Sequence, residues 1–252
     1  MGAKAVKFGC NHLSMRKCLL FLFTVLLVGT SRAQTAVVKD ADGYCSIRQS
    51  ADIGSKIIDT LHIERLVYIL PDQENSEWYQ VDYIKSNRKP LDQICSGFIH
   101  RSRVVLLSSF GRFSRVEETA SKLLLSLDSL HFEIAFRPFS RKVRKIEYGI
   151  SEGEERYVKS IDGTFPWGID GNIPRQEYEF VKIIAGKRTN RLAPKFIGDL
   201  FEPNLSMTSA YYDPASGRCY LEALNSDGAG AYMVVWVFEH GELVSRETFI
   251  PF

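Results

Sequence analysis

The amino-acid sequence predicts a mainly β protein: a small barrel followed by a second β-rich domain that holds an antiparallel sheet and one short helix. Three observations support this fold class. Short apolar runs alternate with polar residues at period two, as in half-buried strands. Asp and Gly recur between these runs, where tight turns need them. Aromatic residues make up 12% of the chain, which is typical of a packed protein rather than a disordered one.

Residues 1–33 have the pattern of an export signal. Arg16 and Lys17 precede an apolar run from Cys18 to Val28, and Ala33 ends a cleavage site of small residues. This run is much shorter than the roughly 20 apolar residues of a membrane-spanning helix, and it favours a cleaved signal peptide. We therefore expect cleavage after Ala33 and a mature protein that is periplasmic or secreted, without stable membrane insertion.

Cleavage changes the charge of the chain. The signal carries five Lys or Arg residues and no acid, so the 32 bases fall to 27 against 30 acids, a net charge of −3. This balance gives no reason to expect a nucleic acid as partner. A basic stretch from Arg137 to Lys145 is followed by an acidic stretch from Glu147 to Glu155, and we interpret both as solvated segments.

Residues 34–107 are predicted to form the barrel. Cys45 and Ile47 alternate with polar neighbours, which is the pattern of a half-buried strand. Further strands are expected at 57–61, 66–70 and 78–83, where β-branched and aromatic residues gather. Several short strands joined by polar turns over about seventy residues are typical of a small barrel.

The order of these segments resembles the bacterial SH3 domain. The resemblance is carried by Asp42-Gly43-Tyr44 with Arg48, by Trp78-Tyr79 with Val81, and by Gly97-Phe98-Ile99 with Ser102 and Val104. It implies an SH3-like domain that binds ligands outside the cytoplasm. Two features depart from the family: Glu64 replaces the glycine of a tight turn, and residues 84–96 exceed the usual hairpin connection. The longer connection is either an added binding loop or a tolerated surface insertion.

Exposed aromatic residues of this domain are the predicted ligand-binding residues, because they give a large contact area at a low entropy cost. The candidates are Tyr44, Trp78, Tyr79, Tyr83 and Phe98. Each has the alternative role of filling the core, since a small domain has few large residues to spare. The implied partners are peptidoglycan, through its wall peptide, or a peptide segment of an envelope protein.

Residues 108–129 are expected to connect the two domains. Ser114 and Glu117 fit a capping box at the start of a helix, whereas the leucines of residues 123–127 fit the start of a strand. The sequence leaves both alternatives open.

The second domain is predicted over residues 130–252. Alternation from Leu130 to Phe136 indicates a strand, and further strands are expected at 143–150, 157–161 and 178–184. Pro194 can begin a short helix over residues 194–201.

Three strands at 219–224, 232–238 and 243–250 are predicted to form a meander. The middle one is apolar on both faces, so both faces must be covered. Residues 130–252 resemble the C-terminal part of exported SH3-domain proteins of Gram-negative bacteria, a resemblance that implies no mechanism.

Asp-Gly loops of the second domain carry the predicted loop residues Trp167, Asp170 and Asp227. If these loops meet, a shared cleft is the best candidate for a specific site. Asp162 and Asn225 could add oxygen ligands for calcium, but Asp and Gly are also the ordinary residues of tight turns. We expect turns, with no metal and no cofactor.

The mature chain holds three cysteines, Cys45, Cys95 and Cys219. Cys45 and Cys95 form either a disulfide or two buried free thiols. The sequence Ser216-Gly217-Arg218-Cys219 is similar to the cysteine motif of wall transpeptidases but lacks its histidine. The histidines also lack the spacing of a zinc site, so we expect no enzyme.

We predict an exported binding protein of the cell envelope whose SH3-like domain recognises cell-wall peptide or a peptide segment of a protein. The alternative is a structural or inhibitory interaction protein whose C-terminal domain does the recognition. A cell-wall-modifying enzyme is the third hypothesis.

Overall fold

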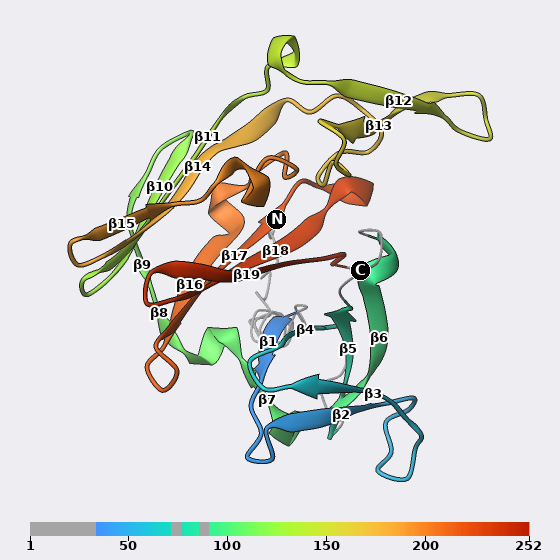
Figure 1. Ribbon diagram of the computed structural model, residues 1–252, viewed down its shortest axis with the longest axis vertical. Helices are drawn as coiled ribbons and strands as arrows, with labels where there is room; N and C mark the ends of the chain where they lie inside the picture. The colour runs from blue at the N-terminus through green and yellow to red at the C-terminus, as the bar shows by residue number, and fades with distance from the viewer. Residues whose placement is uncertain (1–33, 72–76, 86–90, 252) are drawn as a thin grey trace, which may run out of the picture. The chain divides into compact units, whose positions relative to one another are not determined.

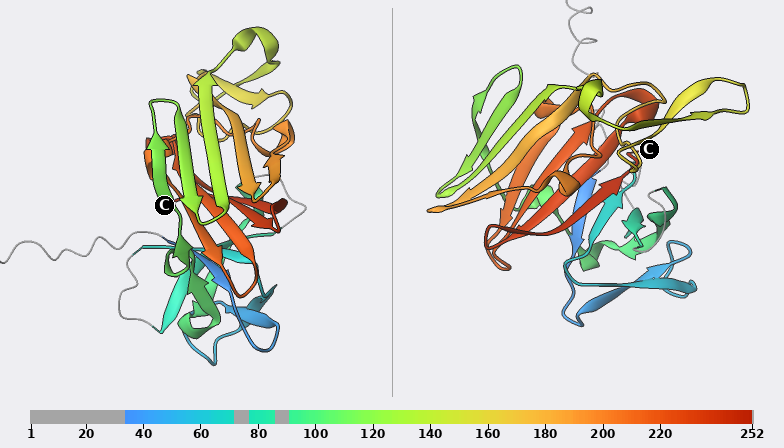
Figure 2. Two further views of the ribbon diagram at one scale, coloured as in Figure 1. Left: turned by 90° about the vertical axis from the view of Figure 1, so that its left-hand side faces the viewer. Right: turned by 45° about the horizontal axis from the view of Figure 1, so that its top comes forward.

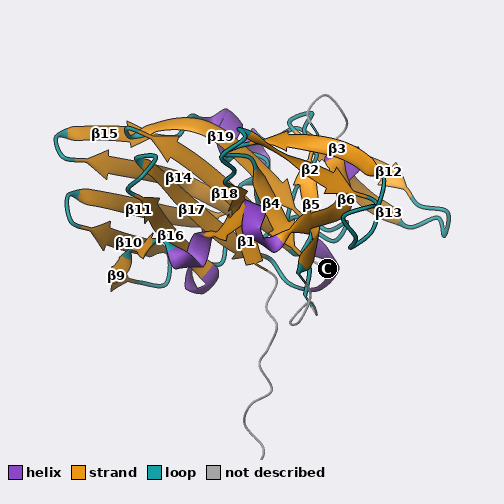
Figure 3. Ribbon diagram, turned by 90° about the horizontal axis from the view of Figure 1, so that it is seen from below, coloured by secondary structure: helices purple, strands orange, loops and turns teal. Residues whose placement is uncertain are grey.

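The computed structural model describes residues 34–71, 77–85 and 91–251, so the predicted signal peptide lies outside the described residues. Within them the chain forms nineteen strands and seven short 3₁₀ turns, which confirms the mainly β fold class. Figure 3 shows the helical segments as brief turns between strands. None of the helices in these ranges is long and apolar enough to cross a membrane.

The N-terminal sheet has seven strands in the order β3-β2-β6-β5-β4-β1-β7. Their bounds are β1 Gln34–Val38, β2 Tyr44–Arg48, β3 Ile57–His62, β4 Leu66–Ile69, β5 Trp78–Ile84, β6 Ile94–His100 and β7 Val104–Leu106. Each of the first six strands contributes to one core cluster, with Ala36, Ile47, Leu61, Val67, Val81 and Ile99 as examples. The sheet therefore curls around that core, and Figure 1 shows β2 and β3 opposite β1 and β4.

Gly97 brings β6 close to β2. A Cβ atom at this position would lie 2.3 Å from Cγ2 of Ile47, far inside the contact distance of two carbon atoms. Without that atom, the two strands meet at the pair Arg48 and Phe98.

Glu64 occupies the turn at which the resemblance expects a glycine. Its φ of 67° lies in the left-handed region that glycine adopts readily. Its carboxylate accepts hydrogen bonds from Nζ of Lys39 at 2.5 Å and from Nη1 of Arg218 at 3.0 Å. Lys39 also pairs with Asp213 at 2.8 Å, so a charged network links this turn to the C-terminal part of the chain.

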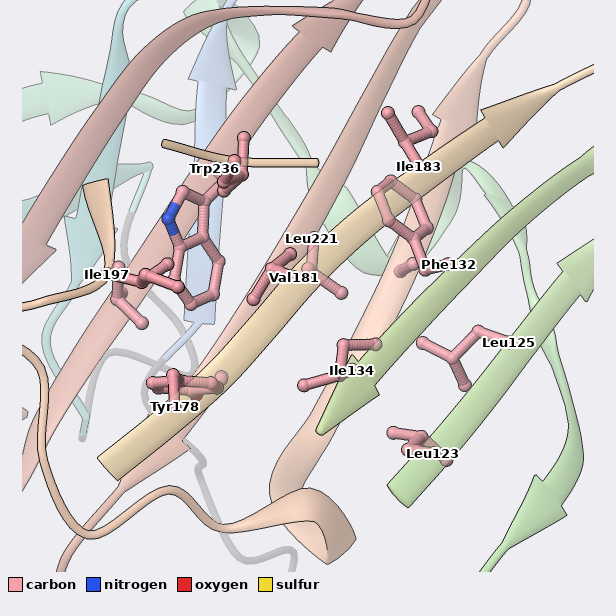
Figure 4. Close-up of a cluster of buried hydrophobic side chains, with 14 of the residues drawn as sticks. Leu123, Leu125, Phe132, Ile134, Tyr178, Val181, Ile183, Ile197, Leu221 and Trp236 are labelled. Carbon is pink, nitrogen blue, oxygen red and sulfur yellow. The ribbon is translucent and has the colours of Figure 1, made fainter. Parts of the chain in front are cut away.

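The C-terminal part contains two five-stranded sheets, in the orders β15-β14-β11-β10-β9 and β19-β18-β17-β16-β8. The first sheet consists of β9 Ser114–Glu118, β10 Lys122–Leu127, β11 Leu130–Pro138, β14 Gln176–Ala185 and β15 Arg188–Arg191. The second consists of β8 Gly111–Arg112, β16 Thr208–Asp213, β17 Arg218–Asn225, β18 Tyr232–Glu239 and β19 Glu242–Phe249. The sheets pack face to face (Figure 2) around a cluster that includes Phe132, Val181, Leu221 and Trp236 (Figure 4).

Strand β18 is covered on both faces, as its composition predicts. Val234 and Trp236 belong to the core between the two five-stranded sheets. Val235 and Val237 face the other way, into a cluster that also holds Tyr68 of the N-terminal sheet. The N-terminal sheet thus supplies the second cover, and all described residues belong to one compact unit.

Residues 108–129 contain strands rather than a plain connection. Strands β9 and β10 pair with each other at the edge of the first five-stranded sheet. The capping-box alternative at Ser114 is therefore wrong, and the strand alternative is confirmed.

The predicted helix over residues 194–201 is shorter than expected. Only a 3₁₀ turn forms, η5 at Pro194–Phe196, with Pro194 at its start. The carbonyl oxygen of Phe196 accepts from Nε1 of Trp236 at 3.1 Å and from Arg246 at 3.3 Å. Leu200 instead donates its backbone N–H to Ile197, so the turn does not continue as an α-helix.

A separate two-stranded hairpin is formed by β12, Ile146–Ile150, and β13, Arg156–Ile161. Its base packs on Phe201 through Ile161, and Figure 1 shows the hairpin extending away from the five-stranded sheets. The first strand begins three residues later than predicted, because Arg141–Val143 form a 3₁₀ turn, η4.

The three cysteines of the described chain are free thiols. Cys45 and Cys219 are buried, and Cys95 is half-buried. The structure therefore has the free-thiol alternative rather than a bridge between Cys45 and Cys95.

Candidate functional site

The outer face of the N-terminal sheet gathers polar and aromatic side chains. Because side chains alternate along a strand, Tyr44 and Arg48 of β2 point away from the core that holds Ile47. On the neighbouring strands, Trp78 of β5 lies opposite His100 of β6. Since β2 also pairs with β6, these side chains converge on one surface.

They line a cleft of about 200 Å³. The rings of Trp78 and His100 meet edge to face with their centroids 5.2 Å apart. The guanidinium of Arg48 lies 6.0 Å from the centroid of the Trp78 ring. Tyr44 is 51% exposed and Ile53 is 74% exposed, so a ligand can reach aromatic and apolar surface at the edge of the cleft.

Charges of both signs lie at the same cleft, on Asp40, Asp42 and Arg103. Arg103 pairs with Asp40 at 2.6 Å and approaches Asp42 at 3.9 Å. The backbone N–H of Asp42, together with Arg103, lowers the pKa of Asp40 below its ordinary value. Cys45 also lines the cleft, but burial raises the pKa of its thiol to about 11, so it stays protonated at neutral pH.

Two of the five aromatic residues predicted for ligand binding line the cleft, namely Tyr44 and Trp78. Tyr44 is exposed as predicted, whereas Trp78 is largely buried, with 8% of its surface exposed. Tyr83 is buried in the core, and its hydroxyl donates to Asp59 at 3.0 Å. Tyr79 packs against the same core under Arg101, whose guanidinium lies 4.5 Å from the ring centroid. Phe98 is half-buried on the outer face, outside the cleft lining.

The cleft also contains residues that sequence reasoning did not select: Arg48, Ile53, His100 and Arg103. Arg48 belongs to the segment that carries the family resemblance, and its place on the outer face follows from alternation with Ile47. His100 comes to Trp78 only through the register of β5 and β6, which the sequence does not specify.

In the C-terminal part of the chain, which we call the second region, the loop that holds Trp167 and Asp170 meets the loop that holds Asp227. The hydroxyl of Ser226 donates to the carbonyl oxygen of Gly168 at 2.8 Å. Gly168 has a φ of 96°, and a Cβ there would lie 2.3 Å from the carbonyl oxygen of Phe201. Trp167 is buried and packs on Tyr232 at 6.1 Å between ring centroids.

A cleft of about 440 Å³ opens beside this junction. Its lining includes Ser226, Asp227, Glu118 and Phe136. Trp167 and Asp170 lie outside the lining, so only Asp227 of the three predicted loop residues contributes. This cleft is polar, and it is the second candidate site of the molecule.

In the described ranges, no three His, Cys, Asp or Glu side chains gather as a metal site requires. Asp162 has a φ of 52° and accepts hydrogen bonds from Nη1 of Arg144 at 2.7 Å and from the backbone of Lys145 at 2.8 Å. Asp170 and Asp227 are exposed. The contacts of Asp162 are those of turn chemistry.

Cys219 lies inside the sandwich core with 4% of its surface exposed. Burial raises the pKa of its thiol to about 12. A nucleophilic cysteine needs a lowered pKa and access to a substrate, and Cys219 has neither in this structure.

The fold and the clefts together define a mainly β protein with two open candidate binding sites on two different sheets. Comparison with protein-family models, with curated proteins and with solved structures found no match. The resemblance to the bacterial SH3 family therefore stays a prediction from the sequence.

Proposed function

We propose that this protein is an exported, non-catalytic binding protein of the cell envelope, and that the cleft on the outer face of the N-terminal sheet recognises a peptide. The observation that carries the proposal is the exposed Tyr44 beside the Trp78–His100 pair, with Arg48 above the ring of Trp78. The signal-like residues 1–33 support a periplasmic or secreted location.

The chemistry of the cleft suits a peptide segment from the cell wall or from an envelope protein. Aromatic rings take up apolar side chains and peptide planes with little loss of conformational entropy. Arg48, Arg103, Asp40 and Asp42 provide donors and acceptors for the charged groups of a peptide. A site with both kinds of surface is typical of peptide recognition.

The proposal is tested with the mature chain, residues 34–252, by co-sedimentation with purified peptidoglycan and by capture from envelope lysate. Tyr44→Ala removes an exposed ring, so it changes the cleft without opening the core. We expect a loss of binding of about tenfold, the effect of truncating a contact aromatic. The matched control is Tyr157→Ala, because Tyr157 is 38% exposed and lies on the β12–β13 hairpin. Equal binding by the two variants and the wild type would overturn the proposal.

The alternative is that the second region recognises a partner protein through the cleft beside Asp227. The meeting of Ser226 with Gly168 favours this alternative, because it fixes one wall of the cleft. Asp227→Asn removes a charge from an exposed side chain. Loss of capture in this variant, with unchanged capture by Tyr44→Ala, would place recognition in the second region.

A further inference from the structure

A third cavity, of about 680 Å³, lies where β14 meets the segment that follows β15. Its floor is apolar and includes Leu192 and Ile197, whose exposed fractions are 4% and 6%. Four cationic side chains also line it: Arg137, Arg144, Arg191 and Lys195. The basic stretch of the sequence thus does not form a solvated segment throughout, since two of its members, Arg137 and Arg144, line this cavity.

Two of the cations are held in place by a buried acid. Glu177, with 2% of its side chain exposed, accepts from Nε of Arg137 at 3.0 Å and from Nη2 of Arg144 at 2.5 Å. Arg144 is fixed further by Asp162 at 2.7 Å. Arg137 is 55% exposed and bonds Glu177 through Nε alone among the described contacts, which leaves its two terminal nitrogens to donate elsewhere.

The other two cations that line the cavity are Arg191 and Lys195. Nη2 of Arg191 donates to the backbone carbonyl of Glu179 at 3.0 Å, and its guanidinium lies 5.2 Å from the ring centroid of Phe180. Nζ of Lys195 lies 4.8 Å from the ring centroid of Phe196. Neither side chain makes an ion pair among those found in the described residues. Both residues are exposed.

Hydrogen bonds hold the segment that forms the apolar floor of the cavity. Trp236 and Arg246 bind the carbonyl oxygen of Phe196. Arg246 also holds both carboxylate oxygens of Asp199, at 2.5 and 2.8 Å, so this acid is already neutralised. Figure 4 shows Ile197 and Tyr178 beside the ring of Trp236.

The charged side chains around the cavity include one more cation than acids. The four cations that line it face three acids, Asp162, Glu177 and Glu179, while Asp199 is paired with Arg246. We propose that this cavity binds a small amphipathic monoanion, a carboxylate joined to an apolar group. The carboxylate would lie between the guanidinium forks of Arg137 and Arg191, a geometry that arginine favours. The apolar group would cover Leu192 and Ile197.

The test uses residues 34–252 and three probes in equilibrium titrations followed by calorimetry and by backbone amide NMR. Hexanoate carries both a carboxylate and an apolar chain, hexanamide is its neutral equivalent, and inorganic phosphate is an anion without an apolar part. We expect saturable binding of hexanoate, with amide shifts at residues 191–197, and at least about tenfold weaker binding of the other two, the loss typical of a charge-assisted bond. Equal affinity for hexanamide, or no saturable binding of hexanoate, would overturn the proposal.

Variants then assign the binding to the cations. Arg137→Gln and Arg191→Gln should each weaken hexanoate binding about tenfold, because each removes one of the two charged donors proposed to hold the carboxylate. Lys187→Gln, on the exposed turn between β14 and β15, should leave it unchanged. All three substitutions are at exposed positions, so the fold is retained, and unchanged melting temperatures check this. If Lys187→Gln weakens binding as much as the other two, the effect is one of overall charge and the assigned cavity is wrong.

Discussion

Glu64 shows how one side chain can serve a turn whose backbone favours glycine. Its φ of 67° costs free energy, while its carboxylate accepts from Lys39, Arg218 and Tyr220. Lys39 directly follows β1, whereas Arg218 and Tyr220 belong to β17, far along the sequence. The contacts that Glu64 makes between the N-terminal sheet and the C-terminal part therefore offset the strain of its backbone.

Substitutions at Glu64 separate these two effects. Glu64→Ala loses the carboxylate contacts and keeps the strain, so we expect it to lower the free energy of unfolding by about 1–2 kcal/mol. Glu64→Gly loses the same contacts but relieves the strain, so it should be about 1 kcal/mol more stable than the alanine variant. Urea denaturation measures both values. Equal stability of the two variants would contradict the left-handed turn.

Glu247 is the clearest source of pH dependence. It lies across β18 from Glu222, with Val235 between them, and its Oε2 has no hydrogen-bond partner among the described residues. Burial raises its pKa from 4.5 to about 7, against the opposing effect of Arg65 at 3.5 Å. A carboxyl whose pKa is higher in the folded state stabilises the fold at low pH, and this contribution is lost as pH rises through the folded pKa.

Glu247→Gln should remove this pH dependence, because glutamine resembles the protonated acid at every pH. At pH 4 we expect the variant and the wild type to have similar stability. At pH 8 the variant should be more stable by about 3 kcal/mol. Chemical denaturation across this range measures the difference, with the exposed Glu152→Gln as control. A difference that does not change with pH would show that Glu247 titrates normally.

At the scale of elements, the loop junction at Gly168 fixes one wall of the second candidate cleft. Its backbone has φ 96°, and its carbonyl oxygen accepts from Ser226. The loop after β13 and the loop after β17 are held together at this point. A change at Gly168 should therefore disturb both loops.

Gly168 and Gly163 form a matched pair for testing this contact. Both have positive φ, 96° and 78°, but a Cβ at Gly163 would meet nothing within 4 Å. Gly163→Ala should cost about 1 kcal/mol from backbone strain alone. Gly168→Ala should cost about 3 kcal/mol or more, because the methyl group also meets the carbonyl of Phe201. Thermal and urea unfolding measure the cost of each substitution. If the two variants are destabilised equally, the loops do not pack as described.

Elements whose own residues determine their structure were predictable from the sequence. The meander β17–β19 follows from β-branched and aromatic runs separated by Asp-Gly and His-Gly turns. Strand β9 was not predicted as a strand, because all five of its residues are exposed and it has no apolar alternation. The length of the helix at Pro194 was overestimated. Trp236 and Arg246, both distant in sequence, bind the carbonyl of Phe196, which a longer helix would use for its own hydrogen bonds.

The candidate site was predictable only in part. Tyr44 and Trp78 could be selected as large aromatics in the SH3-like frame. The positions of His100 and Arg103 depend on strand register and on the fold of the turn after β6. Tyr83 could not be distinguished from a surface aromatic, because its burial depends on the curl of the whole sheet.

At the scale of the whole molecule, the N-terminal sheet and the second five-stranded sheet share a core. Tyr68 stacks on Phe249 with ring centroids 5.7 Å apart, and both are almost fully buried. Val37, Leu66 and Leu107 belong to the same cluster. Residues 34–107 produced alone would expose these side chains, so point variants of residues 34–252 are the better probes of function.

This shared core predicts one cooperative unfolding transition. In urea, far-UV circular dichroism and tryptophan fluorescence should give the same midpoint, because the parts unfold together. Tyr68→Ala should lower the free energy of unfolding by about 3–5 kcal/mol. The urea midpoint should therefore fall by the same amount for both probes. Two separate transitions in the wild-type protein would show that the shared core does not couple the parts.

The central claim is that the cleft beside Trp78 binds a peptide, and the tryptophan indole N–H signals in an NMR titration test it most directly. Trp78, Trp167 and Trp236 are the three tryptophans, and only Trp78 lines this cleft. With soluble, peptide-bearing fragments of peptidoglycan as the ligand, the Trp78 signal should shift in a saturable way while the signal of Trp236, bonded to Phe196, stays in place. Saturable binding with an unchanged Trp78 signal, or no shift at fragment concentrations that block co-sedimentation with the wall, would contradict the claim.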